Sequence, residues 1–155
     1  MISQFETACK IIQDLHVEIM TLLEAVGSEG MNWTPEIHDV NSMYAIANHT
    51  ILSQYWWIQE NLNQEKIERN RPAEFKARAE NLESLRILYS EIETLTQNVL
   101  EEIPQEETQV LRQVRERQVT IEWIVLHVIE HTALHLGHMQ LMKQLWESSL
   151  KGTHS

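Results

Sequence analysis

Residues 121–145 have the sequence IEWIVLHVIEHTALHLGHMQLMKQL, which contains four of the eight histidines of the chain. Each residue of an α-helix turns about 100°, so the four lie within an arc of roughly 80°: His127, His131, His135 and His138. Apolar residues continue this face at steps of three and four, the spacing of a bundle helix: Ile124, Val128, Met142 and Leu145. The histidines therefore occupy positions where core leucines are usual. An unpaired buried polar group costs about 1–3 kcal/mol, and one metal ion can satisfy several imidazoles.

Apolar residues at helical spacing predict three further helices before this one. They are expected over residues 4–23 with stops near Gly27 and Gly30, from an N-cap at Asn41 or Ser42 to about Asn63, and from Pro72 to Pro104. The last helix is expected from Thr120 to about Ser148, after a polar, irregular crossing segment over 105–118. The chain is therefore predicted to be all-α: a four-helix bundle in one domain over residues 1–150, with a short tail over 151–155 that includes His154.

Composition and charge exclude several classes of function. The 12 Lys and Arg residues stand against 23 Asp and Glu, and the formal net charge is −11. Contacts to phosphates need clustered Lys and Arg, and no basic patch is expected here, so nucleic-acid binding is not expected. The chain opens without a basic and apolar leader, and charged residues interrupt its most apolar stretch. A cytoplasmic protein without membrane segments is therefore expected.

The histidine spacing predicts a metal site. Two histidines four residues apart on a helix can bind one divalent ion, with nitrogen ligands at about 2.0–2.1 Å. His131 and His135 have this spacing, but so do His127 and His131, and spacing leaves both pairs open. A tight site needs a third ligand from another helix, either His49 on the apolar stripe of the second predicted helix or His16 on the first. Three histidines leave one coordination position open for water or substrate, which is typical of catalytic sites.

Other metal motifs are absent. The pair lies in His131-Thr-Ala-Leu-His135, so it lacks the glutamate that acts as general base in zinc proteases. Di-iron carboxylate bundles use Glu-x-x-His pairs, and no histidine of the predicted helices has a glutamate three residues before it. Cys9 is the only cysteine, which excludes a disulfide framework and a cysteine-based zinc site.

Three groups of residues together resemble the DinB/YfiT-like superfamily of metal-binding four-helix bundles. They are Trp33-Thr34-Pro35, then Ser42 with His49 and Tyr55-Trp56-Trp57, then Glu130-His131-Thr-Ala-Leu-His135-Leu-Gly137-His138. The last group carries a His-x-x-x-His-x-Gly-His/Gln signature, the most specific part of the resemblance. The likeness covers most of the chain.

This resemblance implies a fold, a ligand set and a chemistry. The fold is an up-down-down-up bundle with a long crossover, often dimeric, so a homodimer is expected. His49, His131 and His135 would be the ligands of a divalent metal, usually zinc or nickel. Many members have Gln at the place of His138, so whether His138 or His127 joins the site stays open. Characterised relatives include S-transferases that use bacillithiol, mycothiol or glutathione, and a maleylpyruvate isomerase.

Two hypotheses of function follow. In the first, the chain is a metal-dependent hydrolase or a thiol-dependent S-transferase, in which the ion lowers the pKa of a water or a thiol and so creates a nucleophile. In the second, the chain is a non-catalytic bundle that the ion stabilises, and it binds a small ligand or dimerises. An open coordination position beside a cleft favours the enzyme, whereas a site closed by His138 favours the structural role.

Overall fold

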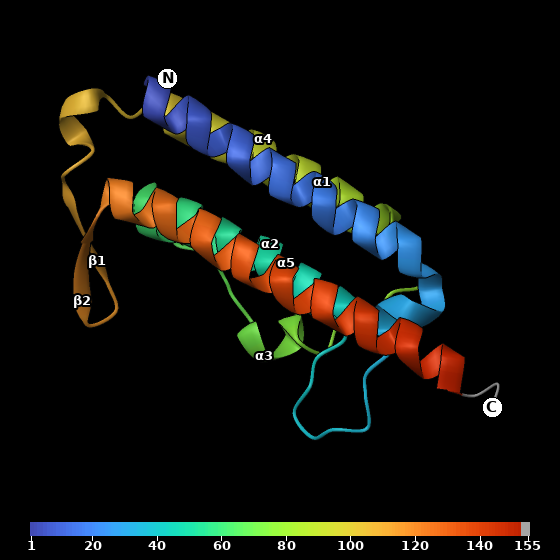
Figure 1. Ribbon diagram of the computed structural model, residues 1–155. Coiled ribbons are helices and arrows are strands. Elements are labelled where there is room, and N and C mark those ends of the chain that lie inside the picture. Colours follow the sequence, from blue (N-terminus) through green and yellow to red (C-terminus); the bar gives the residue numbers. More distant parts are fainter. Residues whose placement is uncertain (153–155) are drawn as a thin grey trace.

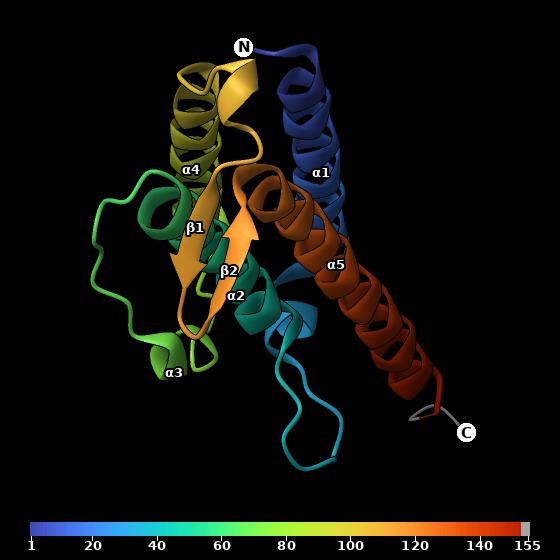
Figure 2. The ribbon, with the colours of Figure 1, turned by 90° about the vertical axis from the view of Figure 1, so that its left-hand side faces the viewer.

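The computed structural model describes residues 1–152, which form a helical bundle with one small β-hairpin (Figures 1 and 2). The long helices are α1 (Ser3–Asn32), α2 (Met43–Tyr55), α4 (Glu83–Glu101) and α5 (Ile121–Gly152). The shorter elements are the π-helical turn η1 (Trp56–Leu62), α3 (Arg71–Glu74), the 3₁₀ turn η2 (Gln105–Glu107) and the antiparallel strands β1 (Leu111–Val114) and β2 (Arg117–Thr120). The all-α, four-helix prediction is confirmed.

Contacts between helix ends establish the directions of the helices. Gln4 donates a hydrogen bond to Glu122 at 2.5 Å, and Gly30 packs against Trp146, so α1 and α5 run parallel. The start of α4 pairs with the end of α1, so these two helices are antiparallel. Tyr89 donates to the carbonyl of Ala47, and Gln54 to Thr96, which makes α2 and α4 parallel. The order is therefore up-down-down-up, and residues 63–82 form the long crossover from α2 to α4 (Figure 1).

The buried residues lie in two neighbouring clusters along the bundle. One includes Leu23, Met43, Ile51 and Met139, and the other includes Phe5, Ile58, Leu100 and Ile121. Helix α5 supplies fully buried residues to both clusters, which explains its length and apolar character.

The buried face of α5 differs from the predicted one at its C-terminal end. Ile124, Val128 and Met142 are buried as expected, but Leu145 is 42 % exposed. The centre of the buried face follows Ile121, Val128 and Met139, so the histidine stripe lies at its edge and not on its midline.

The third predicted helix, from Pro72 to Pro104, is wrong in its first third. After the single turn of α3 the chain leaves the helix, and α4 begins only at Glu83. The side chain of Asn81 accepts a hydrogen bond from the Glu83 N–H at 3.0 Å, an interaction that marks a helix start. Glu74 and Phe75 contact His49, so tertiary contacts hold this segment out of a continuous helix.

The irregular segment predicted over 105–118 is also wrong, because it contains most of a β-hairpin. Val114 pairs with Arg117 across a two-residue turn, and Val114 and Val119 are buried. Such turns usually contain Asn-Gly or Asp-Gly, whereas this turn is Arg115-Glu116, with φ = 55° at Arg115. The sequence therefore lacks the usual signal for the hairpin.

The ends of the first two and last helices test the remaining predictions. Ser42 caps α2 as expected and accepts from the Ala45 N–H at 3.2 Å. Helix α1 continues beyond the predicted stop, because only Gly27 leaves helical geometry and the chain resumes the helix after it. Helix α5 extends to Gly152, and His154 lies outside the described residues. None of the described helices has the length and apolar character that a membrane-spanning segment requires.

Candidate metal centre

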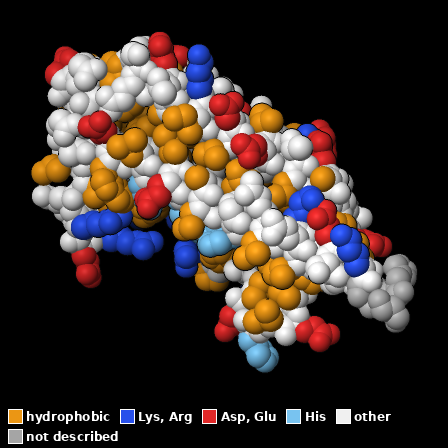
Figure 3. All heavy atoms as spheres, in the orientation of Figure 1, with side chains coloured by type: hydrophobic (Ala, Val, Ile, Leu, Met, Phe, Trp, Pro, Cys, Tyr) orange, Lys and Arg blue, Asp and Glu red, His pale blue; other side chains and the backbone are white. Residues whose placement is uncertain are grey.

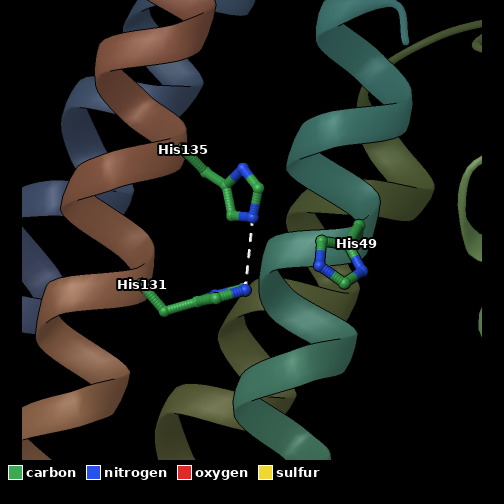
Figure 4. A group of neighbouring side chains, drawn as sticks. All are labelled: His49, His131 and His135. Carbon is green, nitrogen blue, oxygen red and sulfur yellow. Dashed lines mark hydrogen bonds between the residues drawn. The ribbon is translucent and has the colours of Figure 1, made fainter. Parts of the chain in front are cut away.

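Helices α2 and α5 bring three histidines together (Figure 4). His49 comes from α2, and His131 and His135 come from successive turns of α5. One nitrogen of each ring lies within 4.8 Å of the others. These are the three residues that the resemblance implies. Their role as metal ligands stays a prediction that the geometry makes chemically reasonable.

The two α5 histidines have the spacing of ligands on one ion. His131 Nε2 and His135 Nε2 lie 3.2 Å apart. Two nitrogens that each lie about 2.0–2.1 Å from a tetrahedral ion are roughly 3.3 Å apart, so the pair fits a shared ion with little movement. The other nitrogen of the ring, His135 Nδ1, is buried and has no hydrogen-bond partner among the described residues.

The electrostatic environment keeps all three imidazoles neutral near pH 7. Burial, followed by the neighbouring His135 and His49, lowers the pKa of His131 to about 3. Burial, followed by His49 and His138, lowers the pKa of His135 to about 4. Burial also lowers the pKa of His49, although Glu74 partly opposes this effect. A neutral imidazole has a free lone pair, so the cluster is in the protonation state that metal binding needs.

A buried carboxylate orients His49. The Nδ1–H of His49 donates to Glu74 Oε2 at 2.7 Å, which leaves Nε2 for the cluster. Arg69 donates to the same carboxylate through Nε at 2.7 Å and Nη2 at 3.0 Å. Burial alone would raise the pKa of Glu74, but the hydrogen bonds from Arg69 and His49 hold it below its usual value. Glu74 is thus an anionic acceptor that fixes the tautomer of His49.

Sequence reasoning missed Glu74 and Arg69. They lie on the crossover, a stretch whose charge density resembles a solvated surface, and Glu74 is nevertheless only 4 % exposed. Nothing in the local sequence distinguishes it from the exposed glutamates around it. Only the packing of the crossover against α2 gives it this position.

The other candidate histidines lie outside the three-residue cluster. His127 stacks on Trp123 with ring centroids 4.7 Å apart and contacts Glu130 at 3.1 Å. His138 is exposed, with its ring 5.5 Å from that of His135. His16, the alternative third ligand, is buried in a different polar group, where its ring contacts Glu93 at 2.5 Å and Gln54 at 3.0 Å.

A cavity of about 370 Å³ opens beside the cluster. Its lining includes His135, His138, Phe75 and Asn41, and Phe75 also stacks on His49 at 4.2 Å. The volume is within the range of small-molecule sites. His135 thus belongs both to the histidine cluster and to the wall of a cavity that can hold a ligand.

The structure corrects the expectation that no basic patch exists. The guanidinium groups of Arg69 and Arg115 both lie over Trp56, at 5.2 and 5.0 Å from the ring centroid, and Arg117 lies over Trp123 at 4.3 Å. Basic side chains gather around the hairpin end of the molecule in Figure 3. Arg69 and Arg115 are far apart in sequence, so the patch exists only in the fold.

The fold and this site define a class of protein, the helical bundles with a three-histidine cluster between two helices. The chain belongs to the mycothiol-S-transferase family, whose model matches residues 15–147 and so includes all three histidines. This is a DinB/YfiT-like family, which confirms the resemblance.

One solved structure supports the fold independently. The chain is similar to a protein described as the conserved protein of a locus from Enterococcus faecalis, with a TM-score of 0.78 and 15 % identity. The match covers 94 % of this chain and 98 % of the other. At this identity the likeness concerns the fold alone. No protein with a curated description matches the chain.

Proposed function

We propose that this chain is a metal-dependent thiol S-transferase. The observation that carries the proposal is the convergence of His49, His131 and His135, with the two α5 nitrogens 3.2 Å apart. Family membership supports the thiol as the substrate class. The cavity beside His135 favours this function over a non-catalytic, metal-stabilised bundle, because a structural site is closed on all sides.

Each residue of the site has a defined task in this proposal. His49, His131 and His135 hold a divalent ion, zinc or nickel, and their low pKa values keep the lone pairs available. When bound, such an ion would lower the pKa of a coordinated thiol, so that the thiol is present as a thiolate near neutral pH. Glu74 accepts the Nδ1–H of His49 and keeps that ring oriented. The cavity beside His135 holds the acceptor molecule.

The proposed reaction is a substitution at an electrophilic carbon. The thiol loses its proton to solvent, and the sulfur forms a bond to the carbon with its electron pair. The leaving group departs with the bonding electrons, or, in an addition, the neighbouring atom receives them and is protonated. The low-molecular-weight thiol is mycothiol, bacillithiol or glutathione. A homodimer in the cytoplasm is part of the same proposal.

Metal content per chain tests the site first. Elemental analysis of untagged protein should find about one equivalent of zinc or nickel in the wild type and in His127→Ala, and strong loss in His49→Ala and His131→Ala. Equal loss in His127→Ala and His131→Ala would refute the ligand assignment. Metal that is substoichiometric and unchanged in His49→Ala would refute the site itself.

Thiol turnover tests the chemistry. Wild-type protein should accelerate the loss of mycothiol, bacillithiol or glutathione in the presence of monochlorobimane, followed by fluorescence, and His131→Ala should not. Metal-loaded protein that accelerates none of the three reactions would favour the non-catalytic bundle.

A further inference from the structure

Two arginines of the β-hairpin, Arg115 in the turn and Arg117 at the start of β2, are held in place by aromatic rings. Arg115 lies 5.0 Å from the Trp56 centroid, and Arg117 lies 4.3 Å from that of Trp123 and 6.0 Å from that of Trp57. The face of an indole ring attracts a guanidinium, and this attraction restricts the conformations of the arginine side chain. We call Arg115 and Arg117 the hairpin arginines. Both are exposed, yet both already have a defined position.

The hairpin arginines carry charge that the described residues do not neutralise. Within residues 1–152 neither guanidinium has a carboxylate at ion-pair distance, although the chain carries 23 acidic residues. Arg69, which also lies over Trp56, differs because Glu74 pairs with it. Each guanidinium has five N–H donors in a planar fork that matches a carboxylate or phosphate. The hairpin therefore presents two free anion-binding groups.

The hairpin arginines line a cavity of about 400 Å³, which we call the hairpin cavity. Its lining is Trp56, Trp57, Val114, Arg115, Glu116 and Arg117. Indole and valine side chains supply apolar surface, and the two guanidiniums supply positive charge. Glu116 is the one acidic residue of this lining, and among the described residues it forms an ion pair with neither arginine. The lining fits an anionic group attached to an apolar body.

The backbone of the turn fixes the position from which Arg115 projects. Arg115 has φ = 55°, in the left-handed region where glycine is favoured over a residue with a long side chain. A two-residue hairpin turn requires a positive φ at its first central residue. An arginine at this position adopts a positive φ less readily than glycine does. Its side chain, however, places a guanidinium over Trp56.

A series of ring contacts links the hairpin cavity to the histidine cluster. The Trp57 ring lies 4.7 Å from that of His127, which lies 6.0 Å from that of His131. Trp123, beneath Arg117, stacks on the same His127 ring at 4.7 Å. Two rings therefore separate the hairpin arginines from the cluster. A ligand that uses both places therefore has to be extended and reach past these two rings, from the hairpin to the histidines.

We propose that the hairpin cavity is an oxyanion subsite, in which Arg115 and Arg117 bind a carboxylate or phosphate carried by the ligand of the metal centre. This assignment rests on the proposed function for the identity of that ligand. Binding of the anion itself depends on the arginines and not on the metal, so the two ideas are tested separately. The net charge of −11 disfavours a nucleic acid as the ligand, because the rest of the surface repels phosphates.

Calorimetric titration of three small probes tests the subsite. The probes are 3-phenylpropionate, phenyl phosphate and the neutral 3-phenylpropanamide, each titrated into the protein as purified. At least one of the two anions should bind about tenfold tighter than the amide, and the preferred one identifies the oxyanion. The double variant Arg115→Gln with Arg117→Gln should weaken that binding at least about tenfold while keeping the wild-type metal content.

Two matched variants separate the subsite from other effects. Arg78→Gln with Lys151→Gln removes the same charge from exposed positions elsewhere and should change the dissociation constant less than about threefold. His131→Ala should lose metal and keep anion binding. If the wild type binds anions but contains no metal, the proposed function fails and the subsite stands.

Four results would overturn the subsite. They are equal binding of the amide and the anions, no binding of either anion to the wild type, wild-type affinity in the hairpin double variant, and loss of anion binding in His131→Ala. The last result would place the anion on the metal. Arginine-dependent binding of a single-stranded 12-nucleotide DNA, without binding of either small anion, would likewise replace the proposal by a nucleic-acid surface.

Discussion

At the scale of single residues, the candidate site depends on one buried carboxylate. The carboxylate of Glu74 accepts hydrogen bonds both from the guanidinium of Arg69 and from the Nδ1–H of His49. The donor–acceptor distances are 2.7 to 3.0 Å. The ring of His49 therefore has one tautomer and one orientation. A carboxylate in this position also makes the imidazole a stronger ligand.

Replacement of Glu74 by Gln should weaken metal binding by about 10- to 100-fold. The amide keeps the shape of the side chain but loses the charge that pairs with Arg69 and His49. Competition with a chelating dye measures the affinity, and circular dichroism checks that the variant is folded.

Glu130→Gln provides the control, because Glu130 contacts His127 from the exposed side of α5. This variant should bind metal as the wild type does. If both variants lost affinity equally, the orienting role of Glu74 would be wrong.

At the scale of elements, two glycines in long helices have opposite roles. Gly27 interrupts α1 with φ = 63° and ψ = −175°, a conformation that residues with a Cβ rarely adopt. Gly137 lies in the interior of α5 between His135 and His138. A Cβ added at either position would meet no atom within 4 Å. The backbone alone therefore determines the effect of an alanine.

Gly27→Ala should destabilise the protein by about 1–3 kcal/mol, whereas Gly137→Ala should stabilise it by roughly 0.5–1 kcal/mol through higher helix propensity. Each kcal/mol shifts the Tm of a chain of this size by roughly 2–4 °C. Thermal unfolding followed by circular dichroism measures both shifts. Gly137→Ala should also keep its metal. A decrease of Tm in Gly137→Ala would mean that the glycine of the signature has a role beyond the helix.

At the scale of the whole molecule, folding removes three neutral imidazoles from water and brings them together. Burial is the main cause of the lowered pKa of His49, His131 and His135. The free energy of unfolding is therefore linked both to protons and to the proposed metal.

Metal-free protein should lose stability as the pH falls from about 6.5 towards about 4. In the unfolded chain a histidine has a pKa near 6.5, but in the folded protein His131 and His135 titrate only at about 3 and about 4. Between these values the unfolded state binds more protons, so acid favours unfolding. Urea unfolding with a chelator present, at pH 7.5, 6.5, 5.5 and 4.5, measures the slope. His131→Ala should flatten it, and an unchanged slope in that variant would contradict the assignment.

Removal of the metal should lower the Tm of the wild type at neutral pH. Free metal at 100 times its dissociation constant adds about 2.7 kcal/mol to the stability, so a chelator should lower the Tm by roughly 5–10 °C. Differential scanning calorimetry with and without the chelator measures the shift. His131→Ala should show none. An identical Tm for wild type with and without chelator would mean that no metal is linked to folding.

Much of the fold was predictable because the signals for helices are local. The 3.6-residue period indicated all four long helices, and Ser42 marked the start of α2 through a hydrogen bond to a residue three positions away. The stripe of α5 histidines follows from helix geometry alone. These features depend on neighbours in sequence, and the amino-acid sequence by itself therefore determined them.

Spacing along the chain left open which groups from different elements meet, and the tertiary structure decided it. Helix packing brings His49 to the α5 pair and leaves His16 with Glu93 and Gln54. The crossover buries Glu74, and the hairpin places Arg115 over Trp56. These contacts join residues that are far apart in the chain, or lie in segments with no helical period. Their free energy comes from burial and pairing across elements, which spacing along the chain does not encode.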